Sequence, residues 1–171
     1  IMQMAEGMDT GDMMKQAAVP IGENDTSEEL YPRLAALGAM LLGQVVYRLE
    51  QGMVTWTPQD DAFATRAPML TRDLSPVDWT KSADVIHNQV RGLLPWPTAT
   101  ATLGGVKFKL YGTRLGNLRT NAPAGEVLQT DKAGIHVACG DGRTLVITHL
   151  QAEGGKRMAA VDYLRGHPLT F

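Results

Sequence analysis

An acidic turn flanked by glycines, near the start of the sequence, is the first place where residue types and spacing indicate chemistry. Residues 4–12 follow an apolar start and hold the carboxylates Asp9 and Asp12 next to the glycines Gly7 and Gly11. Open α/β sheets place reactive groups in loops beside strand ends, where a carboxylate is positioned to move a proton. An ordinary turn stabilised by its own acids has the same pattern. The spacing alone leaves both interpretations open.

A row of basic side chains in the C-terminal half is the second candidate site. Apolar and polar residues alternate over 106–111, so Lys107, Lys109 and Tyr111 are expected on the polar face of one strand. Four further cations are candidates to extend this row: Arg114, Arg119, Lys156 and Arg157. Arg72 is a candidate to reach RNA bound between domains. Such cations contact RNA phosphates without reading sequence, although a merely solvated charged face has the same pattern.

The charge distribution indicates two units with different partners. The 171 residues carry a net charge of −2. Ten acidic and four basic residues in 1–71 give −6, whereas twelve basic and eight acidic residues in 72–171 give +4. The positive half favours a polyanionic partner such as nucleic acid, although solubility alone also accounts for so modest a charge.

The histidines and the single cysteine do not predict a metal site. His136 and His149 fall in separate predicted strands, with Cys139 near the first of them. A structural zinc ion needs four ligands at workable spacing, which these residues do not supply. We therefore expect no metal, a structural cysteine, and histidines on the surface, His87 included. A lone cysteine forms no internal disulfide and fits a reducing cytoplasm.

The elements that must position these residues begin with a predicted strand over 13–21 and a long helix. Residues 26–29 (Thr-Ser-Glu-Glu) match a capping box, which opens a helix that ends at about Gly52. Pro32 predicts a kink or a separate first turn, because proline forfeits a backbone hydrogen bond. An apolar stripe at helical spacing predicts packing against a sheet. Its members are Leu30, Leu34, Leu37, Leu41 and Val45.

The second half of the sequence predicts a small barrel behind a linker. Residues 53–71 keep neither helical nor strand periodicity and predict an interdomain linker. Asp78 or Thr80 is expected to cap a second helix, which Pro95-Trp96-Pro97 ends. Five short strands follow, which predict a small barrel, and a last helix comes after them. The strands are expected at about 98–103, 106–111, 127–130, 135–139 and 145–150, and the last helix at 158–165.

Composition excludes several classes of protein. The 44% apolar and 20% charged content is that of an ordinary globular protein with one or two domains. No run of about eighteen apolar residues occurs, so we expect no membrane span. Ile1 stands in an apolar context without the basic region of a signal peptide, and we expect the chain to begin inside a domain.

Taken together, these segments resemble the C-terminal part of the methionyl-tRNA formyltransferases, in an order and spacing that cover almost all of the chain. The segment Met2-Gln3-Met4 through Asp9-Thr10-Gly11-Asp12 is typical of folate-dependent formyltransferases generally. Two later segments, Pro95-Trp96-Pro97 and Gly154-Gly155-Lys156-Arg157-Met158, favour the branch that acts on tRNA. The remaining matches are Asp25-Thr26-Ser27, Asp78-Trp79-Thr80-Lys81-Ser82-Ala83 and residues 86–91.

The resemblance implies an α+β, multidomain fold. Residues 1–52 would be the C-terminal remnant of a doubly wound α/β formyltransferase domain, 53–71 the linker, and 72–171 an OB-like β-barrel domain with flanking helices that helps to hold tRNA. It implies a cytoplasmic monomer without a membrane or metal. The partners would be methionyl initiator tRNA and 10-formyltetrahydrofolate, which donates its formyl group to the methionine amine.

The resemblance also implies residue roles. The catalytic trio of the family is Asn, His and Asp, and only the Asp has a counterpart here, Asp9. Asp12 either caps the turn or touches the pterin region of the folate. The RNA-binding candidates are the basic residues named above. Because the other two catalytic groups would lie upstream of Ile1, we expect no formyl transfer by this chain alone. Two alternatives are a non-catalytic RNA-binding module and a sister formyltransferase acting on a sugar nucleotide or on free folate.

Overall fold

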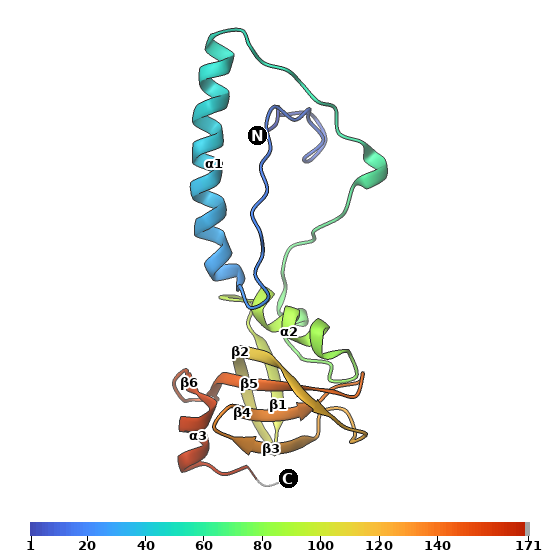
Figure 1. Cartoon of the computed structure of the whole chain (residues 1–171), viewed down its shortest axis with the longest axis vertical. Helices are drawn as coiled ribbons and strands as arrows, with labels where there is room; N and C mark the ends of the chain where they lie inside the picture. The colour runs from blue at the N-terminus through green and yellow to red at the C-terminus, as the bar shows by residue number, and fades with distance from the viewer. Residues whose placement is uncertain (170–171) are drawn as a thin grey trace. The chain divides into compact units, whose positions relative to one another are not determined.

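The structure is a computed structural model that describes residues 1–169. The chain forms two compact units: the first comprises Ile1–Glu23 and Glu28–Met69, the second Asn24–Ser27 and the described residues from Leu70 onward. Figure 1 labels the elements. In chain order they are α1 (Ser27–Glu50), the 3-10 turns η1 (Asp61–Phe63) and η2 (Arg72–Leu74), α2 (Ala83–Gly92), β1 (Ala99–Leu103), β2 (Val106–Arg119), β3 (Val127–Asp131), β4 (Gly134–Ala138), β5 (Arg143–Ala152), β6 (Met158–Ala159) and α3 (Ala160–Gly166).

Helix α1 dominates the first unit. Acidic residues in its first turn and Arg48 in its last complement the helix dipole. Of the predicted apolar stripe, only Leu41 and Val45 are fully buried. The separate first turn expected at Pro32 does not form, since the helix runs unbroken from Ser27 to Glu50. The helix ends as predicted, with Gly52 in the left-handed conformation at φ 68°.

The strand predicted over residues 13–21 is not formed. Met13 makes only single antiparallel bridges, to Met2 and to Thr57. Beyond it, the segment contacts α1 through side chains: Lys15 Nζ donates a hydrogen bond to Gln44 Oε1 at 2.5 Å. Met14 and Lys15 still exchange backbone hydrogen bonds with Ile1. A strand needs a continuous hydrogen-bonding neighbour along its edge, and no backbone ladder is found along the rest of this segment in the described part of the chain.

By length and composition, α1 is also able to cross a membrane. Its most apolar stretch has a mean hydropathy of 1.2, and 11% of that stretch is buried. This corrects the expectation drawn from the lack of a continuous apolar run. Core helices of soluble proteins and signal sequences have the same properties, so length and hydropathy do not decide what α1 does.

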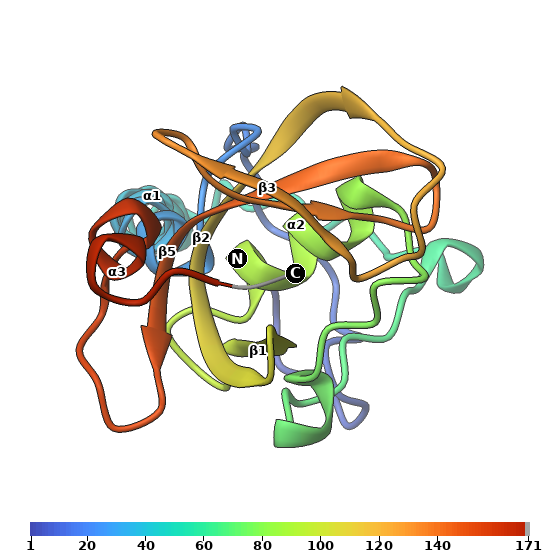
Figure 2. The same ribbon diagram turned by 90° about the horizontal axis from the view of Figure 1, so that it is seen from below.

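The second unit is built on one strongly curved antiparallel sheet, as the sequence predicted. Its strands follow the order β1-β2-β5-β4-β3, and β6 pairs with the end of β5. Figure 2 shows the strands curling around a core. In the described part of the chain no ladder joins β1 to β3, so the barrel-like sheet is closed by packing rather than by hydrogen bonds. The α+β class predicted from sequence is confirmed.

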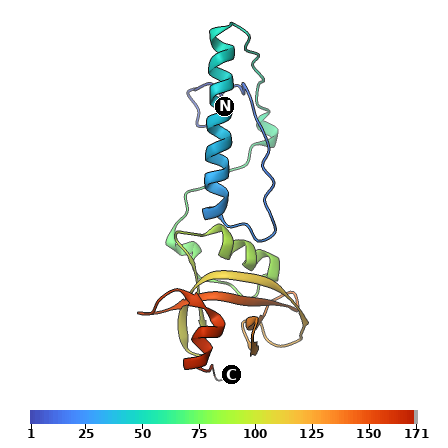
Figure 3. The same ribbon diagram turned by 60° about the vertical axis from the view of Figure 1, so that its left-hand side comes forward.

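The core of this unit is formed by the buried faces of all five main strands, β4 being buried throughout, and by the helices at the two ends of the sheet. Phe108 and Leu110 of β2 are 1% and 0% exposed. Figures 1 and 3 show α2 and α3 at opposite ends of the sheet. Tyr163 of α3 meets Phe108 edge to face, with ring centroids 5.2 Å apart. The last helix begins at Ala160 rather than at 158, because Met158 and Ala159 pair with β5.

Helix α2 is fastened to the sheet by a different cap from the one expected. Ser82 caps it by accepting a hydrogen bond from the Val85 N–H at 3.4 Å. Asp78 instead accepts from the backbone N–H and the hydroxyl of Thr80, in the turn before the helix. These two hydrogen bonds hold the pKa of Asp78 below its ordinary value. Ser82 is therefore a third polar residue able to cap the helix, besides the predicted Asp78 and Thr80.

Candidate functional sites: an acidic turn and a basic face

The acidic turn at residues 7–12 is held by a side chain distant in sequence. The amide nitrogen of Gln59 donates to the carbonyl oxygens of Asp9 and Gly11, at 2.8 and 2.7 Å. Thr10 Oγ1 donates to the Gly7 carbonyl at 3.0 Å. Asp9 adopts φ 57°, the left-handed region that Asp tolerates better than most residues. No local sequence signal pointed to Gln59, which lies in the predicted linker.

Within this turn, glycine is required at position 11. A Cβ atom there would lie 1.8 Å from the carbonyl oxygen of Gln3, so only glycine allows the two segments to approach. Asp9 is exposed and Asp12 is half-buried. Among the described residues, neither carboxylate has a hydrogen-bonding or ionic partner. The turn therefore presents two acids on a braced backbone, and Asp9 is the more accessible of the two.

The basic face is the outer surface of β2 and its neighbours, and it contains Lys107, Lys109, Arg114 and Arg157. Because Phe108 and Leu110 fill the core, Lys107 and Lys109 project outward, as the alternation predicted. A β-bulge at Gly112 then shifts the alternation by one residue. Thr113 is buried and Arg114 is exposed as a result. Without the bulge, Arg114 would share the inward side with Phe108 and Leu110.

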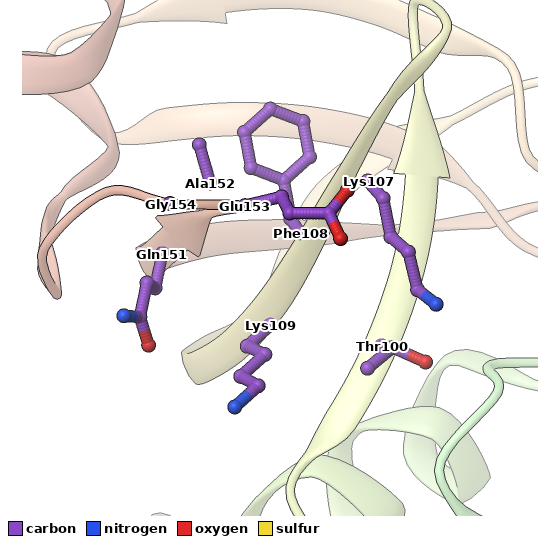
Figure 4. Close-up of a pocket in the computed structure, with 8 residues that line it drawn as sticks. All are labelled: Thr100, Lys107, Phe108, Lys109, Gln151, Ala152, Glu153 and Gly154. Carbon is purple, nitrogen blue, oxygen red and sulfur yellow. The ribbon is translucent and has the colours of Figure 1, made fainter.

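A cleft of about 310 Å³ opens on this face. Its residues come from three neighbouring strands, since Thr100 of β1 and Gln151 of β5 both pair with Lys109. Figure 4 shows Lys107, Lys109 and Gln151 on one side of the strands, and Phe108 and Ala152 on the other. Glu153 reaches the cleft from the β5–β6 turn. The cleft therefore combines polar side chains with apolar surface, to which Phe108, Ala152 and Gly154 contribute.

Hydrogen bonds and a cation–π contact connect the cleft to Arg157. Tyr111 donates its hydroxyl hydrogen to Gln151 Oε1 at 2.9 Å. Gln151 Nε2 in turn donates to the Gly155 carbonyl at 2.8 Å. The Arg157 guanidinium lies over the Tyr111 ring, 4.6 Å from its centroid. Gln151 and Glu153 were not singled out from sequence, because polar residues at the end of a strand do not distinguish a cleft from ordinary surface.

The other predicted RNA-binding residues lie apart from the cleft. Lys156 is exposed in the β5–β6 turn, close to Arg157 in sequence. Arg119 is exposed at the far end of β2, where it lines a second recess with Asp141. Arg72 is exposed in η2, outside the sheet. The structure thus brings Lys107 and Lys109 to one cleft, connects Arg157 to it through Tyr111 and Gln151, and places Arg119 at a different recess.

Ion pairing divides the cations of the second unit into two groups. Arg143 contacts Asp84 and donates through Nε to Asp141 Oδ2 at 2.6 Å. These hydrogen bonds raise the pKa of Arg143, which stays charged, and the two carboxylates compensate its positive charge. Lys107, Lys109 and Arg114 have no carboxylate within ion-pair distance among the described residues. Their charge is therefore available to an external anion.

Two of the three histidines expected on the surface are buried. His87 is 4% exposed, and its Nδ1 lies 2.8 Å from Thr113 Oγ1. His136 is 7% exposed, and its Nε2 lies 3.1 Å from Asp131 Oδ1. The hydrogen bond from the Ala133 N–H, and then that from His136, lower the pKa of Asp131. His87 belongs to α2 and contacts Thr113 of β2, whose side chain points inward after the bulge. Helical spacing alone does not reveal this contact. His149 is exposed, as predicted.

Cys139 is structural, as predicted. It is buried, and this burial raises its pKa to about 11, so the thiol is a poor nucleophile at neutral pH. Among residues 1–169, no group of three or more His, Cys, Asp and Glu side chains is arranged to hold a metal ion.

Family comparisons match both units. The family model described as "Formyl transferase, C-terminal domain" matches residues 69–168, and the model "Formyl transferase" matches residues 1–46. The chain belongs to the formyl transferase family. The resemblance inferred from the Asp-Thr-Gly and Pro-Trp-Pro segments is thereby confirmed. The second match includes most of α1, which makes that helix part of a formyl transferase domain.

Relatives within the family carry a more specific name. The chain is 42% identical over 170 residues to the methionyl-tRNA formyltransferase of Trichlorobacter lovleyi, covering 99% of this chain and 53% of the relative. It is 45% identical over 169 residues to that of Acidobacterium capsulatum, covering 99% of this chain and 54% of the relative. The chain thus spans about half the length of the curated relatives that it matches.

Solved structures share the fold at low sequence identity. HypX from Aquifex aeolicus, in complex with tetrahydrofolic acid, superposes with a TM-score of 0.67 at 18% identity, over 95% of this chain and 29% of that one. WlaRD, a sugar 3N-formyl transferase, superposes with a TM-score of 0.67 at 17% identity, over 85% of this chain and 52% of that one. At these identities the likeness concerns the fold.

Proposed function

We propose that this chain takes part in the transfer of a formyl group from 10-formyltetrahydrofolate to the amine of methionyl initiator tRNA, in the cytoplasm, as part of a monomer. The methionyl-tRNA formyltransferases at 42% and 45% identity support this proposal. In it, residues 1–52 belong to the catalytic domain, 53–71 link the domains, and 72–171 bind tRNA. The folate is a co-substrate in this scheme.

Asp9 is proposed as the catalytic residue of this chain. Its role would be to orient a neighbouring catalytic group and to help accept the proton that leaves the attacking amine. An exposed carboxylate on a turn fixed by Gln59 suits this role, because its position is set by the backbone. Asp12 is proposed to lie at the pterin side of the folate. The family resemblance assigns the Asn and His of the trio to no residue of this sequence, so we propose that the chain alone does not transfer the formyl group.

The basic face carries the tRNA-binding part of the proposal. Lys107 and Lys109 are exposed and have no ion-pair partner among the described residues. Arg157 lies over Tyr111, which is hydrogen-bonded to Gln151 of the cleft. Exposed cations held on a rigid sheet attract the phosphates of a polyanion. Arg114 and Lys156 extend this face, and Arg119 and Arg72 are proposed as outlying contacts.

Binding of an initiator tRNA transcript tests this proposal directly. We expect an affinity that falls steeply as salt rises, because each phosphate contact releases counterions. Replacing both lysines (K107A/K109A) should weaken binding about tenfold and reduce the slope of log affinity against log salt by roughly 1.5. The matched control is K132A, which removes an exposed cation from the β3–β4 turn and should change neither value. Binding that does not depend on salt would contradict the proposal.

A formyl-transfer assay tests the expected inactivity of this chain, and competition binding tests the sugar-nucleotide alternative. With 10-formyltetrahydrofolate and charged initiator tRNA, the isolated chain should produce no formylmethionyl-tRNA. Turnover would show that Asp9 works without the other two groups. If the chain binds an amino-sugar nucleotide as tightly as tRNA, the sister enzymes that act on sugar nucleotides are favoured instead.

A further inference from the structure

We propose that the cleft between β1, β2 and the β5–β6 turn binds one ribose–phosphate unit of RNA, with Lys107 and Lys109 on the phosphate and Glu153 on the ribose 2′-hydroxyl. The inference deepens the proposed function and rests on it. It assigns the cleft a chemical preference, RNA over DNA, that a basic surface by itself does not have.

The phosphate side of the cleft is formed by two adjacent outward positions of β2. Lys107 and Lys109 are separated by one residue, so their side chains leave the same face of the strand and flank the cleft (Figure 4). Thr100 lies directly across from Lys109 on β1 and adds a hydroxyl donor. Two ammonium groups and a hydroxyl are suitable donors for phosphate oxygens.

Glu153 is the only acid among the residues that line this cleft, and simple attraction of phosphates does not account for it. A carboxylate beside two lysines lowers their pull on an anion. It does not form an ion pair with either lysine, because no such contact within 4.0 Å occurs among the described residues. Its oxygens are therefore free to accept a hydrogen bond from a ligand. In RNA, the 2′-hydroxyl is a donor next to the phosphate, and DNA lacks it.

The position of Glu153 is fixed by the turn that carries it. The Gly155 N–H donates to the Ala152 carbonyl at 2.9 Å, which closes a tight turn around residues 153 and 154. Gly154 adopts φ 73° at its corner. Gln151 braces the same turn through its hydrogen bond to the Gly155 carbonyl, and Tyr111 holds Gln151 in turn. Glu153 is thus presented by a braced turn beside the two lysines.

The cleft does not offer a surface on which a base would stack. The one aromatic residue among those that line it is Phe108, whose side chain points to the core and is 1% exposed. A volume of about 310 Å³ is at the small end of ligand sites, which run from roughly 300 to 1,000 Å³. The cleft therefore suits one backbone unit, recognised through phosphate and sugar without reading the base.

The test compares oligouridylate with oligodeoxyuridylate of the same length, by fluorescence anisotropy at low salt. The chain should bind the ribose form about tenfold more tightly, the value expected for one hydrogen bond to a charged acceptor. The variant E153A should reduce this ratio to near one, while its affinity for the deoxy form stays equal or rises. The matched control E126A removes an exposed acid outside the cleft and should preserve the ratio. Circular dichroism would confirm that both variants are folded.

Each outcome decides the proposal. A purely electrostatic role for Glu153 predicts that E153A strengthens both oligomers equally and keeps the ratio, which would overturn the inference. Equal binding of both oligomers by the unaltered chain, or binding of neither, would overturn it as well. Displacement of the RNA by uridine monophosphate at micromolar concentration would instead identify a free nucleotide as the ligand. If initiator tRNA still binds in a salt-dependent way when the ratio test fails, only this inference fails and the proposed function stands.

Discussion

Replacing Asp141 should loosen the connection between α2 and the sheet. This carboxylate joins three groups: its Oδ1 accepts from the N–H groups of Arg143, at 3.2 Å, and Ala83, at 3.4 Å. Its Oδ2 accepts from Arg143 Nε at 2.6 Å. Arg143 also pairs with Asp84 in the first turn of α2. Asp141 thus holds the start of α2 against the β4–β5 turn.

The expected cost of the D141A substitution follows from the exposure of these groups. The side chains of Asp141 and Arg143 are 26% and 27% exposed, so water screens part of their interaction. A buried hydrogen bond between charged groups contributes about 1.5–3 kcal/mol, and an exposed ion pair less than about 1 kcal/mol. The Ala83 contact is long and adds little. We therefore expect a loss of about 1–2 kcal/mol, which lowers the melting temperature of a domain of this size by roughly 5–10 °C.

The stabilisation that Asp141 provides should depend on pH, and its direction follows from the pKa of this carboxyl group. Burial raises the pKa of Asp141, but the hydrogen bonds from Arg143 and Ala83 outweigh it and hold the pKa below the ordinary 3.8. A group whose pKa is lowered by folding stabilises the protein above its unfolded pKa and loses that contribution as the pH falls. The difference between the unaltered protein and D141A should thus be full at neutral pH and shrink below pH 3.8.

Calorimetric melting at several pH values measures this difference. The matched control is D162A, because Asp162 forms an ion pair with Arg165 at 2.7 Å but is 52% exposed. Its removal should cost about 0.5 kcal/mol or less. If D141A melts like D162A, or if its deficit is the same at acid and neutral pH, the carboxylate does not fasten α2 in the way described.

Two further substitutions and one chemical modification test other parts of the structure. F108A removes a side chain that is 1% exposed and packs on Tyr163, so urea denaturation should show a loss of about 3–5 kcal/mol. G11A places a Cβ atom 1.8 Å from the Gln3 carbonyl oxygen, and amide chemical shifts of residues 7–12 should change while those of β2 do not. Cys139, with its pKa raised to about 11, should react slowly with iodoacetamide at pH 8 and rapidly once urea unfolds the chain.

The sequence predicted the elements of the second unit well because their signals are local. Alternation over 106–111 places each side chain on a definite face, and the turns between strands carry glycine at the required positions. The end of α1 was also predicted from a local signal, since Gly52 is suited to the left-handed conformation. The strand expected over 13–21 failed for the opposite reason: an extended segment becomes a strand only where another segment pairs with it.

The candidate sites were predicted in part, and the missing parts depend on tertiary contacts. Lys107 and Lys109 were found because alternation alone puts them outside the core. Gln59 and Glu153 were missed, since their roles come from a hydrogen bond to residues 9–11 and from a turn that faces another strand. His87 was wrongly placed on the surface because its partner is Thr113, which the bulge at Gly112 turns inward; the glycine indicates a bulge but does not indicate which helix residue the bulge contacts.

The modest net charge of the second unit understates the charge that its sheet offers to a ligand. On the α2 and α3 sides, cations are paired: Lys81 with Asp78, Arg143 with Asp84 and Asp141, and Arg165 with Asp162. On the outer surface of β2, no described carboxylate pairs with the cations. Several acids thus compensate cations close to α2 and α3, whereas the described cations on the outer surface of β2 keep their charge for a ligand. Glu153 is the exception on that face, which is why its removal is the most informative single change for what the cleft binds.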